Sequence, residues 1–140
     1  MKQDSCGFLL KQIHDAIRKR VDNRLRENGL TMTQVRLLME LGDSEDDALS
    51  LKELERHFRV AQSTIVGIVL RLEAKGFVQG YVASDDSRVK LVRLTPEGAA
   101  IREAHKKEID ELEELLVSGL TEREGLDLLR MLHNVYERIR

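Results

Sequence analysis

Residues 50–76 read SLKELERHFRVAQSTIVGIVLRLEAKG, and this stretch decides the fold. Ser50 and Glu53 have the spacing of a capping box, which marks the start of a helix. The pattern breaks at residues 59–61, and a longer helix opens at Gln62 and ends at the Lys-Gly pair. Apolar residues recur at helical spacing on both sides of the break. Two helices joined by about three residues predict a helix-turn-helix.

The period of the pattern changes directly after these two helices. Residues 77–83 and 89–94 are short runs rich in β-branched residues, separated by Ser84-Asp85-Asp86-Ser87. Polar turn residues between two such runs predict a β-hairpin. A hairpin that follows a helix-turn-helix is a wing. Thr95 before Pro96 then marks the start of the next helix.

Helical patterns also flank this segment on both sides. Residues 8–25 carry apolar side chains three to four apart, and Asn28-Gly29 is a typical helix end. Thr31 with Gln34 predicts a second helix, and the acidic residues 42–48 after it are expected to form a loop. Thr121 with Glu124 opens the last helix. The predicted class is mainly α (α+β), with four helices, a hairpin and two more helices.

Composition restricts the class of protein further. The chain has 140 residues, the usual size of one domain, and 34% of them are charged. No run approaches the ~18 consecutive apolar residues of a membrane span, and residues 1–6 lack the apolar core of a secretory signal. The single cysteine, Cys6, cannot form an internal disulfide, which favours a reducing cytoplasm. No cofactor and no membrane partner is expected.

The charge distribution is more informative than the net charge of −2. Residues 50–94 contain eight basic and five acidic side chains, whereas acidic residues gather at 43–47 and in the C-terminal third. A local basic face on an acidic protein is typical of a surface that contacts phosphates.

Three motifs resemble the MarR (multiple antibiotic resistance regulator) family. Residues 30–34, LTMTQ, are similar to the "LTxxQ" start of that family's second helix, and residues 54–76 follow its helix-turn-helix pattern. Residues 86–88, five further residues and then 94–98, LTPEG, match the wing pattern D-x-R-x5-L-T-x-x-G without insertion or deletion. The resemblance covers essentially the whole chain. It departs at Gly80, where relatives often carry Arg, and at Val66 and Gly67, where polar residues are common.

The resemblance implies a transcription regulator that binds double-stranded operator DNA. The N-terminal residues of the second helix of a helix-turn-helix reach base edges in the major groove; here they are Gln62, Ser63 and Thr64. Glutamine can bond both N6 and N7 of adenine. Alternatively, Ser63 and Thr64 only cap the helix.

The wing has its own predicted contacts. The resemblance assigns Arg88 to the minor groove, whose negative potential favours arginine, with Asp86 bracing the guanidinium and Lys90 nearby. The alternative for Arg88 and Asp86 is an ordinary surface ion pair. Four more basic residues are candidate phosphate contacts: Lys52, Arg56, Arg71 and Arg93.

The first helix and the last two carry wide apolar stripes beside a small DNA-binding lobe. A homodimer buries such stripes, and two-fold dimers are the commonest oligomers; intramolecular packing is the alternative. We therefore expect one MarR-like domain over 1–140, with a winged helix-turn-helix at 30–98 and dimerisation helices at 5–28 and 99–140. Two copies would bind a pseudo-palindromic operator, as a repressor whose affinity an effector changes.

Other functions receive less support. The resemblance implies a small aromatic or anionic effector, and no chemical class is selected by the residues. Cys6 is a candidate redox sensor, but it is one position from where the family's sensing cysteine would fall. The four histidines lack a spacing that would hold a metal. No catalytic motif is present, so an enzyme is not expected. The rival hypothesis is a protein-interaction module that keeps this fold and uses the acidic residues 43–47.

Overall fold

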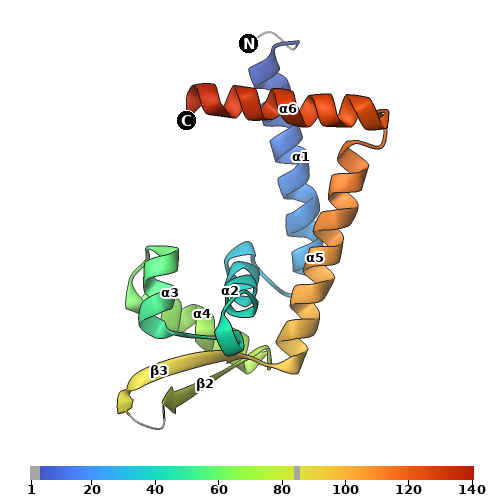
Figure 1. Cartoon of the computed structure of the whole chain (residues 1–140). Helices are drawn as coiled ribbons and strands as arrows, with labels where there is room; N and C mark the ends of the chain where they lie inside the picture. Colours follow the sequence, from blue (N-terminus) through green and yellow to red (C-terminus); the bar gives the residue numbers. More distant parts are fainter. Residues whose placement is uncertain (1–3, 84–85) are drawn as a thin grey trace. The chain divides into compact units, whose positions relative to one another are not determined.

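The computed structural model describes residues 4–83 and 86–140. In chain order, the elements are α1 (Cys6–Glu27), α2 (Met32–Gly42), the 3-10 helix η1 (Glu45–Asp47), β1 (Ala48–Ser50), α3 (Leu51–Phe58), α4 (Gln62–Ala74), β2 (Val78–Ala83), β3 (Asp86–Leu94), α5 (Pro96–Leu116) and α6 (Glu122–Ile139) (Figure 1). The chain divides into two compact units, Met1–Arg102 and Glu103–Arg140, so α5 begins in the first unit and continues in the second.

Local capping explains where most helices begin. In α2, the Gln34 N–H donates to Thr31 Oγ1 at 3.2 Å, and the Thr31 N–H donates to Gln34 Oε1 at 3.2 Å. The same reciprocal pair opens α3 and α6. Each pair satisfies two N–H groups that have no partner inside the helix. All three capping boxes predicted from the sequence are confirmed.

The break between α3 and α4 depends on one unusual backbone conformation. Arg59 has φ 54° and ψ 44°, the left-handed conformation that ends helices. The chain then turns through residues 60–61 and starts α4 at Gln62. The predicted helix-turn-helix is confirmed, with the break at the predicted residues.

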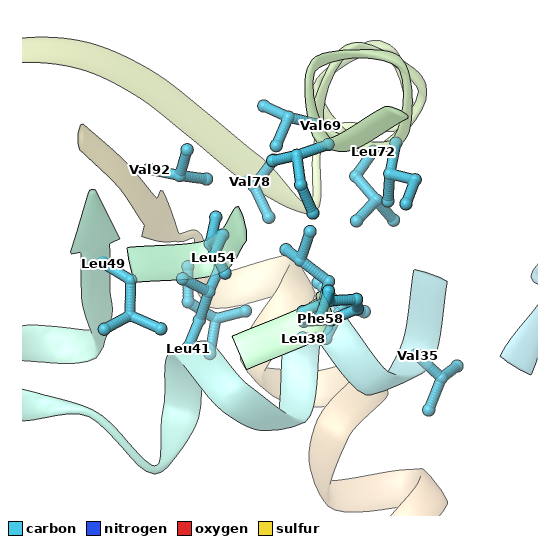
Figure 2. Close-up of a cluster of buried hydrophobic side chains, with 14 of the residues drawn as sticks. Val35, Leu38, Leu41, Leu49, Leu54, Phe58, Val69, Leu72, Val78 and Val92 are labelled. Carbon is cyan, nitrogen blue, oxygen red and sulfur yellow. The ribbon is translucent and has the colours of Figure 1, made fainter. Parts of the chain in front are cut away.

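The first unit has a core of aliphatic side chains (Figure 2). Leu38 and Leu41 of α2, Leu54 of α3, and Leu72 of α4 are 0% exposed. Val78 of β2 and Val92 of β3 close the same cluster, each 1–2% exposed. Fixing α3 and α4 on this core holds the outward side of α4 in a set orientation.

The predicted hairpin is confirmed, and it belongs to a larger sheet. The sheet has three strands in the order β1-β3-β2, all antiparallel, with Gly80 opposite Val92 and Leu49 opposite Val92 on the other side. The prediction of a loop over residues 42–48 was wrong at its ends, because Gly42 closes α2 and Ala48 begins β1. A three-residue strand has too short a pattern to be recognised, and it forms here because β3 supplies its hydrogen-bond partners. The predicted turn over residues 84–87 was wrong at its end, because Asp86 and Ser87 already belong to β3. Ser84 and Asp85 lie outside the described residues.

The second unit consists of the later part of α5 and α6. None of the α6 residues is buried, although the helix is strongly amphipathic in sequence. Among its apolar side chains, Leu126 is 58% exposed, Leu129 56% and Tyr136 60%. No helix in the described parts of the chain is long and apolar enough to cross a membrane.

Candidate nucleic-acid interface

The N-terminus of α4 is open to solvent. Gln62, Ser63 and Thr64 are all exposed, while the next residue, Ile65, is completely buried. The N-cap position is Ala61, which makes no side-chain capping bond. The alternative that Ser63 and Thr64 serve as the helix cap is therefore wrong. Their hydroxyl groups are exposed beside a helix N-terminus, whose N–H groups and dipole favour an anion such as phosphate.

A basic cavity of about 550 Å³ lies next to this helix end. Its walls come from the start of α3, the start of α4 and β3. Four of the predicted contact residues line it together: Lys52, Arg56, Gln62 and Lys90. Glu53 is also a wall residue, but its carboxylate accepts the Ser50 N–H at 2.8 Å. Three cations around one cavity give this surface a positive field that attracts phosphates.

The remaining predicted contacts lie elsewhere. Arg71 is exposed in the last turn of α4. Arg93 is exposed on β3, where its guanidinium lies 4.7 Å from the centre of the Tyr81 ring and donates to the Tyr81 hydroxyl at 3.1 Å. Arg93 therefore has an internal partner, which the sequence did not indicate. The backbone of Asp86 and Arg88 lies in β3, but their side chains are outside the described residues.

Contacts between side chains on the surface hold α2 and α3 together. The Arg36 guanidinium lies 4.3 Å from the centre of the Phe58 ring and donates to the His57 carbonyl at 2.9 Å. His57 Nδ1 is 3.1 Å from a Glu40 carboxylate oxygen. These residues are 17 to 22 positions apart in sequence, so no local signal could have identified them.

A second cavity, of about 280 Å³, separates α4 from the hairpin. Its walls are mainly apolar and include Val66, Val69, Leu70, Tyr81 and Val82. Val66 is the residue at one of the positions where the sequence departs from the family pattern. Val66 therefore adds one more apolar side chain to this wall.

The sequence left two other kinds of site open. Cys6 is exposed, and it is the first residue of α1. Within residues 4–83 and 86–140, no group of three His, Cys, Asp or Glu side chains is placed to hold a metal ion.

Known proteins resemble this chain along its whole length. The sequence model described as "MarR family" matches residues 28–88. The transcriptional repressor IacR of Pseudomonas putida is 28% identical over 138 residues, covering 99% of this chain and 81% of the relative. The multiple antibiotic resistance protein MarR of Salmonella typhimurium is 27% identical over 130 residues, covering 92% of this chain and 89% of the relative.

Solved structures agree with the sequence relatives. A point mutant of Staphylococcus aureus MepR superimposes with a TM-score of 0.89 at 25% identity, covering 97% of this chain and 99% of that one. A complex of S. aureus MepR with DNA superimposes with a TM-score of 0.84 at 25% identity, covering 96% and 99%. The described residues form six α-helices and a winged helix-turn-helix, and with these relatives the chain belongs to the MarR family of transcription regulators.

Proposed function

We propose that this chain is a repressor that binds a pseudo-palindromic operator as a homodimer. The observation that carries the proposal is the open N-terminus of α4 beside the basic cavity. A helix N-terminus with exposed Gln62, Ser63 and Thr64 suits base edges, and the adjacent Lys52, Arg56 and Lys90 suit the flanking phosphates. The proposed role of the chain is to bind DNA, and the relatives named above are likewise regulators.

Each part of the surface has a separate task in this proposal. Gln62 bonds an adenine in the major groove, and Ser63 and Thr64 bond bases or phosphates. The wing enters the minor groove through Arg88, braced by Asp86. Arg71 and Arg93 are weaker candidates for phosphate contact. Arg71 lies about two and a half helical turns from the open end of α4, and Arg93 is held by Tyr81.

The exposed apolar side chains of α6 support the homodimer. A solvent-exposed amphipathic helix without a buried residue is stable only when something covers its apolar side. A second copy is the partner that a palindromic operator requires, with half-sites about 34–36 Å apart. We assign dimerisation to residues 5–28 and 99–140, and DNA binding to residues 30–98.

Regulation by a small effector is the remaining part of the proposal. A small aromatic molecule would suit the apolar cavity between α4 and the hairpin, whereas an anionic one would suit the basic cavity beside Gln62. Either effector would oppose the conformation that binds DNA. For this, the effector must bind the DNA-binding and non-binding conformations with unequal affinity. A regulator of this kind works where the DNA is, which in a bacterium is the cytoplasm.

The test is fluorescence anisotropy on a labelled duplex selected by this protein from a random-sequence pool, at several salt concentrations. We expect saturable, salt-dependent binding about 10³-fold or more tighter than binding to a scrambled duplex. Gln62→Ala and Arg88→Ala are each expected to weaken it. A pool that yields no preferred site, with equal weak binding to every duplex, would refute the proposal and favour a protein-interaction role.

A further inference from the structure

We propose that Glu73 is a positioning residue that holds the wing at a fixed place on α4, and that glycine at position 80 leaves room for this contact. Glu73 lies in the last turn of α4, and Gly80 lies in β2. The inference rests on the proposed function, because positioning the wing matters only if the wing contacts DNA.

A hydrogen bond joins the two elements directly. The Gly80 N–H donates to Glu73 Oε2 at 2.8 Å. In the sheet order β1-β3-β2, β2 is an edge strand, and alternate N–H groups of an edge strand point away from its neighbour. The Glu73 carboxylate therefore binds a donor that β3 cannot reach. Hydrogen bonds to an ionised acceptor are stronger than neutral ones.

Side-chain packing between the hairpin and α4 is incomplete at this point. Glu73 and Gly80 both line the cavity of about 280 Å³ that separates the two elements. Atoms on the wall of a cavity lack contacts on one side, so they resist displacement less than close-packed atoms do. The Glu73 side chain reaches across this gap, which is why one hydrogen bond can have a measurable effect on the hairpin.

The geometry also shows why a glycine fits at position 80. A Cβ at position 80 would lie 3.0 Å from Glu73 Oε2, closer than most carbon atoms approach a neighbour. A side chain at position 80 would therefore require the Glu73 carboxylate to shift by a few tenths of an ångström. Glycine at position 80 thus leaves room for the contact from α4 to the backbone of β2.

Two substitutions at position 73 separate the hydrogen bond from the charge. Glu73→Ala and Glu73→Gln both remove one negative charge near DNA, but only glutamine keeps an acceptor oxygen at the same reach. We expect Glu73→Ala to bind the selected duplex about 3- to 10-fold more weakly than Glu73→Gln, the range of one hydrogen bond. Equal affinities for the two variants would overturn the proposal.

Repeating the comparison of the two Glu73 variants in a protein that also carries Arg88→Ala tests whether Glu73 affects DNA binding through the wing. With Arg88→Ala present, the ratio between the alanine and glutamine variants should fall to near one, because the wing no longer contributes its main contact. A ratio that is unchanged in this background would mean that Glu73 acts elsewhere, and would overturn the proposal.

Hydrogen–deuterium exchange without DNA keeps this inference separate from the proposed function. The peptide covering residues 78–94 should exchange faster in Glu73→Ala than in Glu73→Gln or the unsubstituted protein. The same exchange in all three would overturn the positioning role. Faster exchange in Glu73→Ala, from a protein with no preferred duplex, would uphold the contact and refute the DNA-binding role that it is proposed to serve.

Discussion

The guanidinium of Arg102, near the start of α5, pairs with the carboxylate of Asp43 at the C-terminus of α2. The Arg102 side chain is only 11% exposed, whereas Asp43 is 69% exposed. The buried partner also covers Gly42, so closely that a Cβ at position 42 would collide with the Arg102 Cδ and guanidinium. One side chain thus fastens the beginning of α5 to the end of α2 within the first unit.

Gly42→Ala should destabilise the protein, although alanine is the better helix former. Alanine inside a helix normally gains about 1 kcal/mol over glycine. Here the added methyl must displace a buried guanidinium, and overpacking of this kind costs about 1–3 kcal/mol. Urea denaturation should therefore show a lower midpoint. In the Arg102→Ala background the same substitution should become neutral or stabilising, and persistent destabilisation there would contradict the collision.

Gly67→Ala provides the opposite case in α4. The position lies inside the helix, and apart from the local helix backbone no atom of the described residues lies within 4 Å of the Cβ that alanine would add. We expect unfolding to become less favourable by about 0.5–1 kcal/mol, because glycine loses more conformational freedom on folding. The same denaturation experiment measures it. A loss of stability would show that the space is occupied.

Local features of the fold were predictable from the sequence, and features that depend on distant residues were not. The capping boxes and the break after Phe58 were predictable because the residues that determine each of them lie within three or four positions of one another. The strand β1 was not, since its stability comes from β3, more than forty residues later. Arg93 illustrates the same limit: it looked like a free cation, and its partner Tyr81 is on the neighbouring strand. Nothing in the sequence indicated that Arg102 would be buried, because its burial depends on contact with α2.

The capping box of α6 predicts a measurable pH effect. The hydrogen bonds between Glu124 and Thr121 favour the ionised carboxylate and lower the pKa of Glu124 below its ordinary value. A carboxyl group whose pKa is lowered in the folded state stabilises the protein at pH values above its ordinary pKa. This stability is lost as the pH falls through the lowered pKa. NMR titration should show the low pKa of Glu124. In Thr121→Ala the pKa should rise only part of the way to its ordinary value, because the variant loses the hydroxyl but keeps the backbone N–H that donates to Glu124. A Glu124 pKa that is not lowered in the unsubstituted protein would contradict the assignment to the cap.

Charge on the apolar side of α6 should disrupt the proposed dimer. Leu129 is 56% exposed in the single chain and lies between Leu126 and Leu132 at helical spacing. Burying a leucine contributes about 1.5–3 kcal/mol, and each substitution occurs twice in a two-fold dimer. Leu129→Glu should therefore raise the dissociation constant at least tenfold in analytical ultracentrifugation. Arg130→Gln, on the adjacent residue, is the control and should leave the dimer intact. A dimer unaffected by Leu129→Glu would place the interface elsewhere.

Lys52 and Gln62 line one cavity, and their replacement by alanine should nevertheless have different effects on DNA binding. A cation that neutralises a phosphate acts on every sequence alike and releases a counterion. Lys52→Ala should therefore weaken binding to the selected and scrambled duplexes by the same factor and reduce the salt slope by about one. Gln62→Ala should leave the slope unchanged and lose about 1–3 kcal/mol on the selected duplex alone, with discrimination relaxed at a single base pair. Anisotropy titrations over a salt series, repeated on duplexes with one base pair changed at a time, separate these outcomes. Equal salt slopes for Lys52→Ala and the unsubstituted protein would remove Lys52 from the phosphate contacts, and unchanged discrimination in Gln62→Ala would show that the N-terminus of α4 does not contact the bases.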